Sequence, residues 1–248
     1  MSIADELSTA EQTDTRRLRI CRCKRGDGGE HFDEFEVPVG PHTTLLDALL
    51  WIQRHLDPTL AVRHSCLHAS CGVCGVQVNG REELACVCEL RDHADQITVE
   101  PLANLAVLTD LVVDMRPFYA HFPEQHPIIR TSELVAGAAA REGLGTFVRL
   151  EDCIECGLCV SACPIAATSH EYVGPAALVA AERLLEEPRG AEPEDVLRWA
   201  DRPDCAWRCH VGMECSRVCP AQALPAERIM ALRRKLIFDG QRGKGAGR

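Results

Sequence analysis

Cysteine spacing is the feature of this chain that most narrows what it can fold into. Fifteen of its 248 residues are cysteines, and they gather in two separate groups. In the second group, the run Cys153–Pro164 has the spacing C-x2-C-x2-C-x3-C-P, which is typical of bacterial ferredoxins. Where such proteins hold two clusters, the fourth cysteine of one run binds the other cluster, so a second run must follow. The segment Cys209–Pro220 supplies it, with Gly212 in place of the second cysteine.

The glycine in the second run predicts that the two clusters differ. If the fourth ligands cross between the runs, one cluster has four thiolates and the other has three, which suits a [3Fe–4S] cluster without its corner iron. The predicted ligands are Cys153, Cys156, Cys159 and Cys219 for [4Fe–4S], and Cys163, Cys209 and Cys215 for [3Fe–4S]. In the alternative, water or another ligand replaces the missing thiolate and both clusters hold four irons.

The first group of cysteines has a different spacing. Its members are Cys66, Cys71, Cys74 and Cys86, and the C-x4-C-x2-C order with a later fourth cysteine is that of plant-type [2Fe–2S] ferredoxins. We expect Gly72 and Gly75 to let this loop fold tightly, so that backbone N–H groups point at the sulfur atoms. A structural zinc site with four cysteine ligands is the alternative.

Four cysteines remain outside these groups, namely Cys21, Cys23, Cys88 and Cys205. We expect buried free thiols here, because cysteine packs like a small hydrophobic residue. Disulfides are disfavoured, since Met1–Arg16 lacks the basic start and apolar core of a secretory signal. The same observation predicts a cytoplasmic protein.

Periodicity predicts an α+β first half and an all-α second half. In the first half, the residues predict strands at Leu18–Lys24, Phe32–Val39, Gly75–Gly80 and Ile97–Val99, and one helix at Leu45–Arg54 capped by Thr43 or Thr44. In the second half, helical patterns cover Ser132–Arg141, Pro175–Glu187, Pro193–Ala200 and Pro225–Leu236. Prolines interrupt regular structure between Pro101 and Pro127. We therefore expect domains at residues 17–115 and 116–240, with flexible tails at 1–16 and 241–248.

Charge and hydropathy exclude other classes of protein. The formal net charge of -10 argues against nucleic acid as a partner, because binding phosphates requires a basic face. No stretch approaches the roughly 18 to 20 apolar residues that a membrane span needs. Even Leu102–Met115 is interrupted by polar and charged residues.

The order of the predicted clusters, two-iron first and then a four-iron and three-iron pair, resembles the iron–sulfur subunits of succinate dehydrogenases and fumarate reductases. Segments besides the cysteine runs carry the resemblance, namely Arg63–Cys66, Leu84–Cys86, Asp110–Met115, Phe118–Tyr119 and Gly174–Ala177. The resemblance implies a β-grasp [2Fe–2S] domain followed by a dicluster ferredoxin domain.

The resemblance also implies a function. In that family the first domain lies against an FAD-containing flavoprotein subunit, and the second docks on an integral membrane anchor. Electrons from succinate pass from FAD through the three clusters to quinone. We therefore expect a succinate dehydrogenase subunit, peripheral on the cytoplasmic face of the bacterial inner membrane, with no substrate chemistry of its own. A fumarate reductase subunit, a soluble multi-cluster shuttle and a non-redox zinc protein are the alternatives.

At the quinone end, the chain departs from that pattern. Many succinate dehydrogenases have a tryptophan at the position of Thr168, four residues after Pro164, whereas His210 resembles the histidine near their quinone. Pro164, Thr168 and His210 are the candidate quinone contacts. Because the indole donor is absent, we expect the membrane subunit to build most of the pocket, or a further carrier to intervene. Menaquinone use is a further option.

Overall fold

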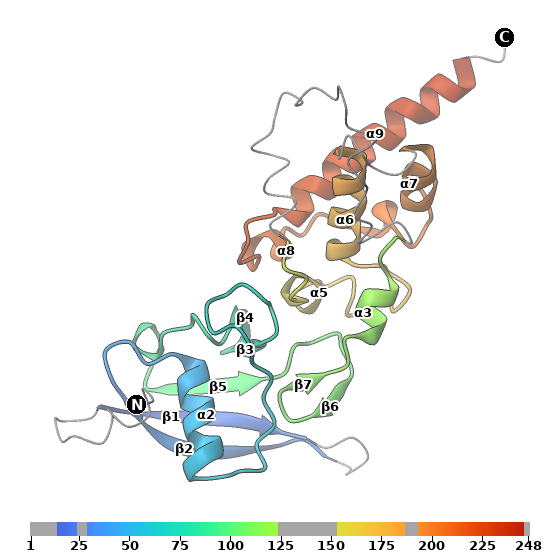
Figure 1. Ribbon diagram of the computed structural model, residues 1–248. Helices are drawn as coiled ribbons and strands as arrows, with labels where there is room; N and C mark the ends of the chain where they lie inside the picture. The colour runs from blue at the N-terminus through green and yellow to red at the C-terminus, as the bar shows by residue number, and fades with distance from the viewer. Residues whose placement is uncertain (1–13, 24–28, 124–152, 187–192, 246–248) are drawn as a thin grey trace, which may run out of the picture. The chain divides into compact units, whose positions relative to one another are not determined.

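The computed structural model describes residues 14–23, 29–123, 153–186 and 193–245, with side chains as far as residue 238. The chain divides into two compact units between Asp114 and Met115, each of which is described by itself (Figure 1). The helix expected at Ser132–Arg141 lies outside the described residues.

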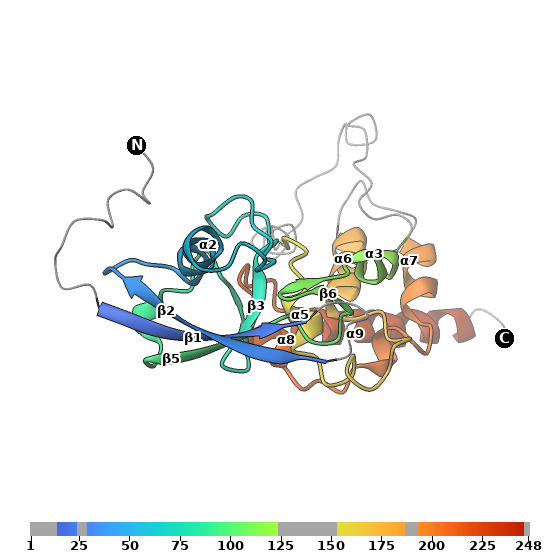
Figure 2. The ribbon, with the colours of Figure 1, turned by 90° about the horizontal axis from the view of Figure 1, so that it is seen from below.

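The first unit is a mixed five-stranded sheet with one long helix. Its strands are β1 (Asp14–Arg22), β2 (His31–Val39), β3 (Gly75–Val78), β4 (Arg81–Leu84) and β5 (Gln96–Glu100), in the spatial order β2-β1-β5-β3-β4. β1 and β5 are parallel, and the other neighbours are antiparallel. The helix α2 (Leu45–His55) lies on one face of this sheet (Figures 1 and 2). This is the expected β-grasp arrangement.

Alternating residues of the two central strands form the core under α2. Leu18 pairs with Ile97 and Ile20 pairs with Val99 across the parallel ladder, and all four are fully buried. Burying each such side chain contributes about 1.5–3 kcal/mol. The core therefore fixes the register of β1 against β5, because a shift by one residue would turn these side chains to the opposite face.

Thr44 is the N-cap that starts α2. The Asp47 N–H donates to Thr44 Oγ1 over 3.2 Å, and the Thr44 N–H donates to Asp47 Oδ2 over 3.0 Å, which is a reciprocal capping box. Of the two caps expected, Thr44 is therefore the one used.

The strand expected at Gly75–Gly80 ends earlier, at Val78. Asn79 and Gly80 have φ of 51° and 77°, and an Asn-Gly pair with both residues at positive φ is typical of a tight hairpin turn. The chain therefore turns back into β4, a strand that the sequence pattern did not predict.

Regular structure reaches into both segments expected to be flexible tails. Asp14–Arg16 belong to β1, where they pair with Val37–Val39 of β2. At the other end, the helix α9 runs from Pro225 to Gly245, past the Leu236 at which its apolar pattern ends. Backbone pairing and helix continuation account for these differences, since neither depends on apolar side chains.

Asp110 ties the end of the first unit to its first strand. Its carboxylate accepts the N–H groups of Cys23 and Ala61 over 3.2 and 2.8 Å, and it lies 3.1 Å from Nε of Arg22. Both charged side chains are buried. The Arg22 guanidinium also contacts Asp33 and Asp57, so a buried positive charge faces several carboxylates. Asp110 lies in the turn between β6 (Val107–Thr109) and β7 (Val112–Val113), which form a small two-stranded sheet.

The second unit is helical, as expected. Besides α9, its described elements are α3 (Arg116–Ala120), α5 (Leu158–Ser161), α6 (Pro175–Glu186), α7 (Pro193–Ala200), the 3-10 turn η3 (Ala206–Arg208) and α8 (Glu214–Arg217). Leu178 and Ala181 of α6 pack in one buried cluster with Ile229 and Leu232 of α9. A salt bridge joins the same two helices, since Nζ of Lys235 lies 2.9 Å from the Glu182 carboxylate.

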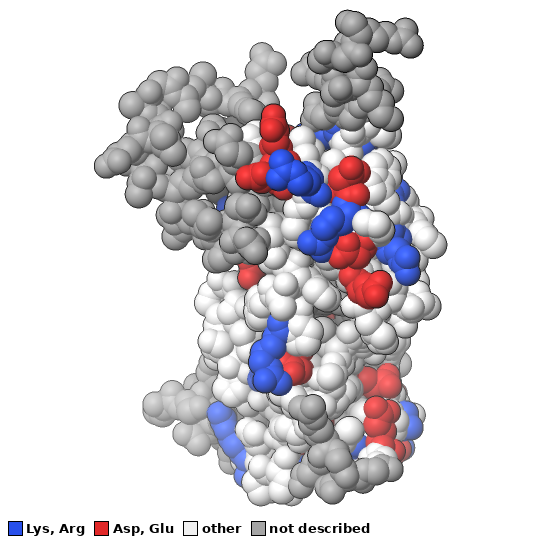
Figure 3. Space-filling view, turned by 90° about the vertical axis from the view of Figure 1, so that its right-hand side faces the viewer, with Lys and Arg blue, Asp and Glu red and all other residues white. Residues whose placement is uncertain are grey.

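Membrane spans and surface charge can be checked on the described part of the chain. None of the helices in the described ranges has both the length and the apolar character needed to cross a membrane. On the face shown in Figure 3, acidic and basic side chains are interspersed.

Candidate iron–sulfur cluster sites

The first group of cysteines lies on the loop before β3 and on the turn after β4. The antiparallel β3–β4 hairpin sets these two segments side by side, and the Ala85 N–H donates to the Cys74 carbonyl over 3.1 Å. The thiol of Cys66 interacts with that of Cys71, and the thiol of Cys74 interacts with those of Cys86 and Cys71. All four predicted [2Fe–2S] ligands therefore flank one hairpin.

Backbone N–H groups of this loop point at sulfur atoms, as expected. The Ala69 N–H donates to Cys86 Sγ and the Ser70 N–H donates to Cys66 Sγ, each over 3.3 Å. Gly72 takes a left-handed backbone with φ of 69°, as the tight loop requires. Gly75 does not contribute in this way, because it is the first residue of β3.

Four cysteines of the second unit line a single pocket. They are Cys153, Cys156, Cys159 and Cys219. Ala176 and Val179 of α6 and Ala223 complete the apolar part of its wall. The Ala223 N–H donates to Cys219 Sγ over 3.3 Å. The chain thus brings Cys219, the last cysteine of the second run, to the first three cysteines of the first run.

The two ferredoxin runs have left-handed residues at the same two positions. Glu155 and Gly157 of the first run have φ of 53° and 82°, and their counterparts Val211 and Met213 have φ of 59° and 65°. In both runs the second left-handed residue is the N-cap of a four-residue helix, α5 or α8. The runs differ at the residue between them, since Gly212 stands where Cys156 stands in the first run.

The glycine at 212 is not required by the backbone. Its φ lies outside the left-handed range, and a Cβ built on it would lie 3.8 Å from Cγ of Pro164, which is ordinary van der Waals contact. By contrast, the β-branched Val211 adopts a backbone that such residues rarely take. Position 212 therefore has room for a side chain, and what it lacks is a thiol.

The remaining three cysteines of the runs lie near a buried tyrosine. Cys163, Cys209 and Cys215 interact electrostatically with one another and with the Tyr172 phenol. Tyr172 is 3% exposed, and its hydroxyl has no hydrogen-bond partner in the described part of the chain. Leaving a buried hydroxyl unpaired costs about 1–3 kcal/mol. A sulfur-rich cofactor held by these thiols fits the site, because its sulfides are acceptors for that hydroxyl.

Two arginines hold the segment that carries Cys209. Nε of Arg233 on α9 donates to the Ala206 carbonyl over 2.8 Å, and its other end donates to the Cys209 carbonyl. Arg208 donates to the Ser169 hydroxyl over 3.1 Å. The loop is thereby anchored to α9 and to the segment after Cys163.

Burial sets the acidity of most of these thiols. Desolvation raises the pKa of Cys74, Cys156 and Cys215 to about 12, and raises that of the deeply buried Cys159 as well. Cys66 differs from these, because the nearby backbone N–H of His68 lowers its pKa to about 6. Buried thiolates require a cation beside them, as iron provides.

The cysteines outside the runs are mostly buried. Cys21 and Cys205 are 2% and 0% exposed, and burial raises their pKa to about 11 and about 12. They behave as packed neutral thiols. Cys23 is half-buried. Cys88 differs, because its Sγ lies 3.2 Å from Nε2 of His93; desolvation, with Glu83 nearby, raises its pKa.

The candidate quinone contacts are on the surface of the second unit. Pro164, Thr168 and His210 are all exposed. The Thr168 hydroxyl donates to the carbonyls of Pro164 and Ile165 over 3.3 and 3.2 Å, so its proton is already engaged in its own turn. Trp207, which is 42% exposed, was not predicted and lies close to Cys209 in the sequence.

Comparison with known families agrees with this geometry. Residues 17–120 match a family described as a 2Fe-2S iron-sulfur cluster binding domain. Residues 149–223 match one described as a 4Fe-4S dicluster domain. The first match favours iron–sulfur over the four-cysteine zinc alternative.

Relatives match over most of their own length. The fumarate reductase iron-sulfur subunits of Escherichia coli and Mycobacterium tuberculosis are 37% and 38% identical over 207 residues, covering 82% and 80% of this chain and 85% and 83% of theirs. The succinate dehydrogenase iron-sulfur subunit of Paracoccus denitrificans is 31% identical over 234 residues, covering 91% of this chain and 89% of its own.

A solved structure shares the fold. A chain of the Mycobacterium smegmatis Sdh1 complex in the apo form superposes with a TM-score of 0.81, at 23% identity, over 92% of this chain and 97% of that chain. This similarity extends over both units.

The unpaired hydroxyl of Tyr172 leads to a test. If the Tyr172 hydroxyl donates to the predicted three-iron cluster, Tyr172→Phe removes that donor, and donors to sulfur stabilise the more negative reduced state. We expect its midpoint potential to fall by about 20–65 mV, corresponding to one hydrogen bond of roughly 0.5–1.5 kcal/mol. Redox titration followed by electron paramagnetic resonance measures it. Tyr119→Phe, at an exposed position, is the control; equal potentials in all three proteins would remove the hydroxyl from the site.

Proposed function

Because the chain belongs to the family of iron–sulfur subunits of succinate dehydrogenases and fumarate reductases, we propose that it serves as the electron-transfer subunit of a succinate dehydrogenase. Its cofactors are [2Fe–2S], [4Fe–4S] and [3Fe–4S] clusters, which exchange single electrons when bound. The observation that carries this proposal is the pair of matched loops, which share two left-handed positions and the short helix after them but differ in one thiol at Gly212.

The residues of the chain divide the task as follows. We assign Cys66, Cys71, Cys74 and Cys86 to [2Fe–2S], the pocket cysteines Cys153, Cys156, Cys159 and Cys219 to [4Fe–4S], and Cys163, Cys209 and Cys215 to [3Fe–4S]. Backbone N–H groups of Ala69 and Ala223 donate to ligand sulfurs. Apolar side chains such as Val179 exclude water from the pocket that these four cysteines line. This chain therefore binds the clusters, orients them and excludes water from them.

Exposed apolar side chains support the proposal that partner subunits bind to this chain. Leu67 and Val87 are 57% and 52% exposed and each follows a predicted [2Fe–2S] ligand in the sequence, which suits docking of a flavoprotein subunit. On the second unit, Trp207, Ile237 and Phe238 are exposed. We propose that this unit docks on a membrane anchor at the cytoplasmic face of the bacterial inner membrane. The domain ranges 17–115 and 116–240 belong to the same proposal.

A fumarate reductase is the second candidate. Among the relatives described above, those of higher identity carry the name fumarate reductase, whereas His210 after Cys209 resembles the succinate dehydrogenase pattern. The direction of turnover depends on the reduction potentials of the clusters and the quinone, because electrons flow toward the carrier with the more positive potential.

Turnover assays test the function and its direction. The purified full-length chain, with its clusters, should neither oxidise succinate nor reduce fumarate, because in this proposal the flavoprotein subunit performs the substrate chemistry. In complex with its partners it should oxidise succinate with quinone faster than it reduces fumarate with quinol. Turnover by the chain alone would contradict the proposal, and faster fumarate reduction would favour the second candidate.

Gly212→Cys tests the ligand assignment. The position has room for a Cβ and matches Cys156, so the new thiol should complete a four-iron site. We expect the iron content to rise by about one atom per chain and the oxidised three-iron resonance to disappear. Gly212→Ala, which adds only the Cβ, should keep that resonance. A folded cysteine variant with the resonance unchanged would contradict the crossed assignment.

His210→Ala tests the quinone end. Since Thr168 is engaged with its own turn and no tryptophan stands there, we propose that the membrane subunit builds most of the pocket, or that a further carrier intervenes before quinone. The KM for quinone in the complex should then change by less than about twofold, or roughly 0.4 kcal/mol. An increase of about tenfold or more would place His210 in the pocket instead. Substituting Thr168 by alanine is the matched control, with the same small change expected.

A further inference from the structure

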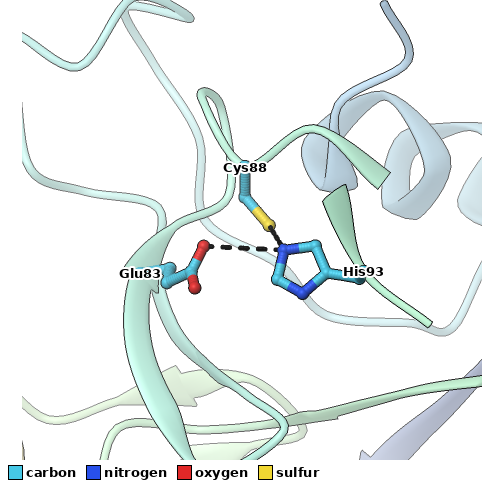
Figure 4. A group of neighbouring side chains, drawn as sticks. All are labelled: Glu83, Cys88 and His93. Atoms are coloured by element: carbon cyan, nitrogen blue, oxygen red, sulfur yellow. Dashed lines mark hydrogen bonds and ion pairs between the residues drawn. The ribbon is translucent and has the colours of Figure 1, made fainter. Parts of the chain in front are cut away.

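Three potential metal ligands meet on the first unit, outside the cysteine groups. Glu83 comes from β4, Cys88 from the turn after it, and His93 from the end of the 3-10 turn η1 (Leu90–Asp92). One ligand atom from each lies within 4.8 Å of the other two. Figure 4 shows the carboxylate and the sulfur atom directed at the same ring nitrogen of His93.

We propose that Glu83, Cys88 and His93 bind one divalent transition-metal ion of the zinc type. The three residues supply sulfur, nitrogen and oxygen, the donor atoms that zinc uses in proteins. Sites with three protein ligands leave a fourth position for water. The ion is additional to the iron–sulfur clusters, and the proposal does not depend on the direction of electron transfer.

The distances are close to those of a tetrahedral site. Zinc–ligand bonds of about 2.3 Å to sulfur and 2.0 Å to nitrogen and oxygen place sulfur roughly 3.5 Å from nitrogen, and nitrogen roughly 3.3 Å from oxygen. In the structure, Cys88 Sγ lies 3.2 Å and Glu83 Oε2 lies 3.8 Å from His93 Nε2. Both distances therefore differ from the tetrahedral values by about half an ångström or less, and the sulfur and the carboxylate oxygen lie within 4.8 Å of each other.

Charge balance also favours a divalent ion. A thiolate and a carboxylate together carry two negative charges, and neutral imidazole carries none, so a divalent cation gives a neutral site. Cys88 is 4% exposed, and the side chains of His93 and Glu83 are 17% and 26% exposed. At such burial, charges without compensation are costly, whereas an edge open to solvent leaves a path for the ion.

The backbone around the three side chains is held in place. The Cys88 carbonyl accepts the Leu45 N–H over 2.7 Å, and the Leu90 N–H donates to the Thr43 carbonyl over 3.0 Å. Leu90 is fully buried, and Glu83 pairs with Val76 of β3. The ligands therefore sit on a framework fixed by α2 and the sheet, which reduces the ordering cost of binding.

The site is separate from the neighbouring [2Fe–2S] ligands. Cys86 is two residues before Cys88, yet its Sγ accepts the N–H of Ala69, while Cys88 Sγ faces His93. The two sulfurs thus have different partners.

Zinc binding by the purified full-length chain, with clusters intact, tests the proposal. After dialysis against about micromolar free Zn²⁺, we expect about one zinc per chain with the iron content unchanged. X-ray absorption at the zinc edge should show one sulfur at about 2.3 Å and otherwise nitrogen or oxygen. Because this edge is distinct from that of iron, the clusters do not obscure the signal.

Variants identify the ligands. Cys88→Ala and His93→Gln should each weaken zinc binding at least tenfold, since even the loss of an outer-shell partner costs about 10–100-fold. Glu83→Gln keeps the shape of the side chain and removes its charge, and it should also weaken zinc binding. It tests the site even if a Cys88 variant fails to fold. Cys21→Ala removes another buried thiol of the same unit and should bind zinc like the unchanged chain.

Three results would overturn the proposal. The first is no zinc on a chain with full iron content, which would mean that the three side chains form only a hydrogen-bonded group. The second is zinc with several sulfur neighbours or with iron lost in proportion, since zinc would then occupy the cluster cysteines. The third is zinc binding that is unaffected by the Cys88 and His93 substitutions.

Discussion

Burial of cysteine sulfur is the constraint on which the rest of this structure depends. A thiol in an apolar surrounding stays protonated, and desolvation raises the pKa of Cys74, Cys156 and Cys215 to about 12. Such a group becomes a ligand only where a cation compensates its charge. In the segments that carry Cys156 and Cys215, the regular structure consists of the four-residue helices α5 and α8, and the left-handed residues Val211 and Met213 precede the second of them. We therefore expect a bound cluster to contribute more than side-chain packing to holding these loops.

The fold class and the cofactors follow from sequence because both depend on spacing. Cysteine intervals are dictated by cluster geometry, and apolar periodicity predicted α2, α7 and β2 nearly to their ends. Elements without such a pattern were missed. β4 has the sequence Arg-Glu-Glu-Leu, and only its pairing with β3 makes it a strand. The short helices α5 and α8 begin at left-handed residues that no propensity indicates. Helix α9 continues beyond its last apolar residue, so its end could not be predicted from hydropathy.

The candidate site was predictable in its ligand types, whereas its surroundings were not. The assignment of ligands to individual clusters remains a prediction, although the pocket gathers the four cysteines expected. Nothing in the sequence marks Tyr172, because a buried phenol differs from an ordinary core aromatic only by an unpaired hydroxyl. Glu83, Cys88 and His93 have no familiar metal-binding spacing either. A hairpin, a turn and a 3-10 turn bring them together, so only the folded structure shows that they are neighbours.

The Asp110 anchor has a consequence for the order in which the molecule forms. Its carboxylate binds the backbone of Cys23, 87 residues earlier in the chain, and the parallel pairing of β1 with β5 likewise joins the start of the first unit to its end. Contacts of such long range form late and slow folding. On the ribosome, the first strand therefore waits without its parallel neighbour until nearly the whole unit has emerged. During that interval the [2Fe–2S] cysteines are already outside, unfolded and open to oxidation. We therefore expect such a nascent chain either to receive its iron early or to be protected from oxidation until residue 110 has left the ribosome.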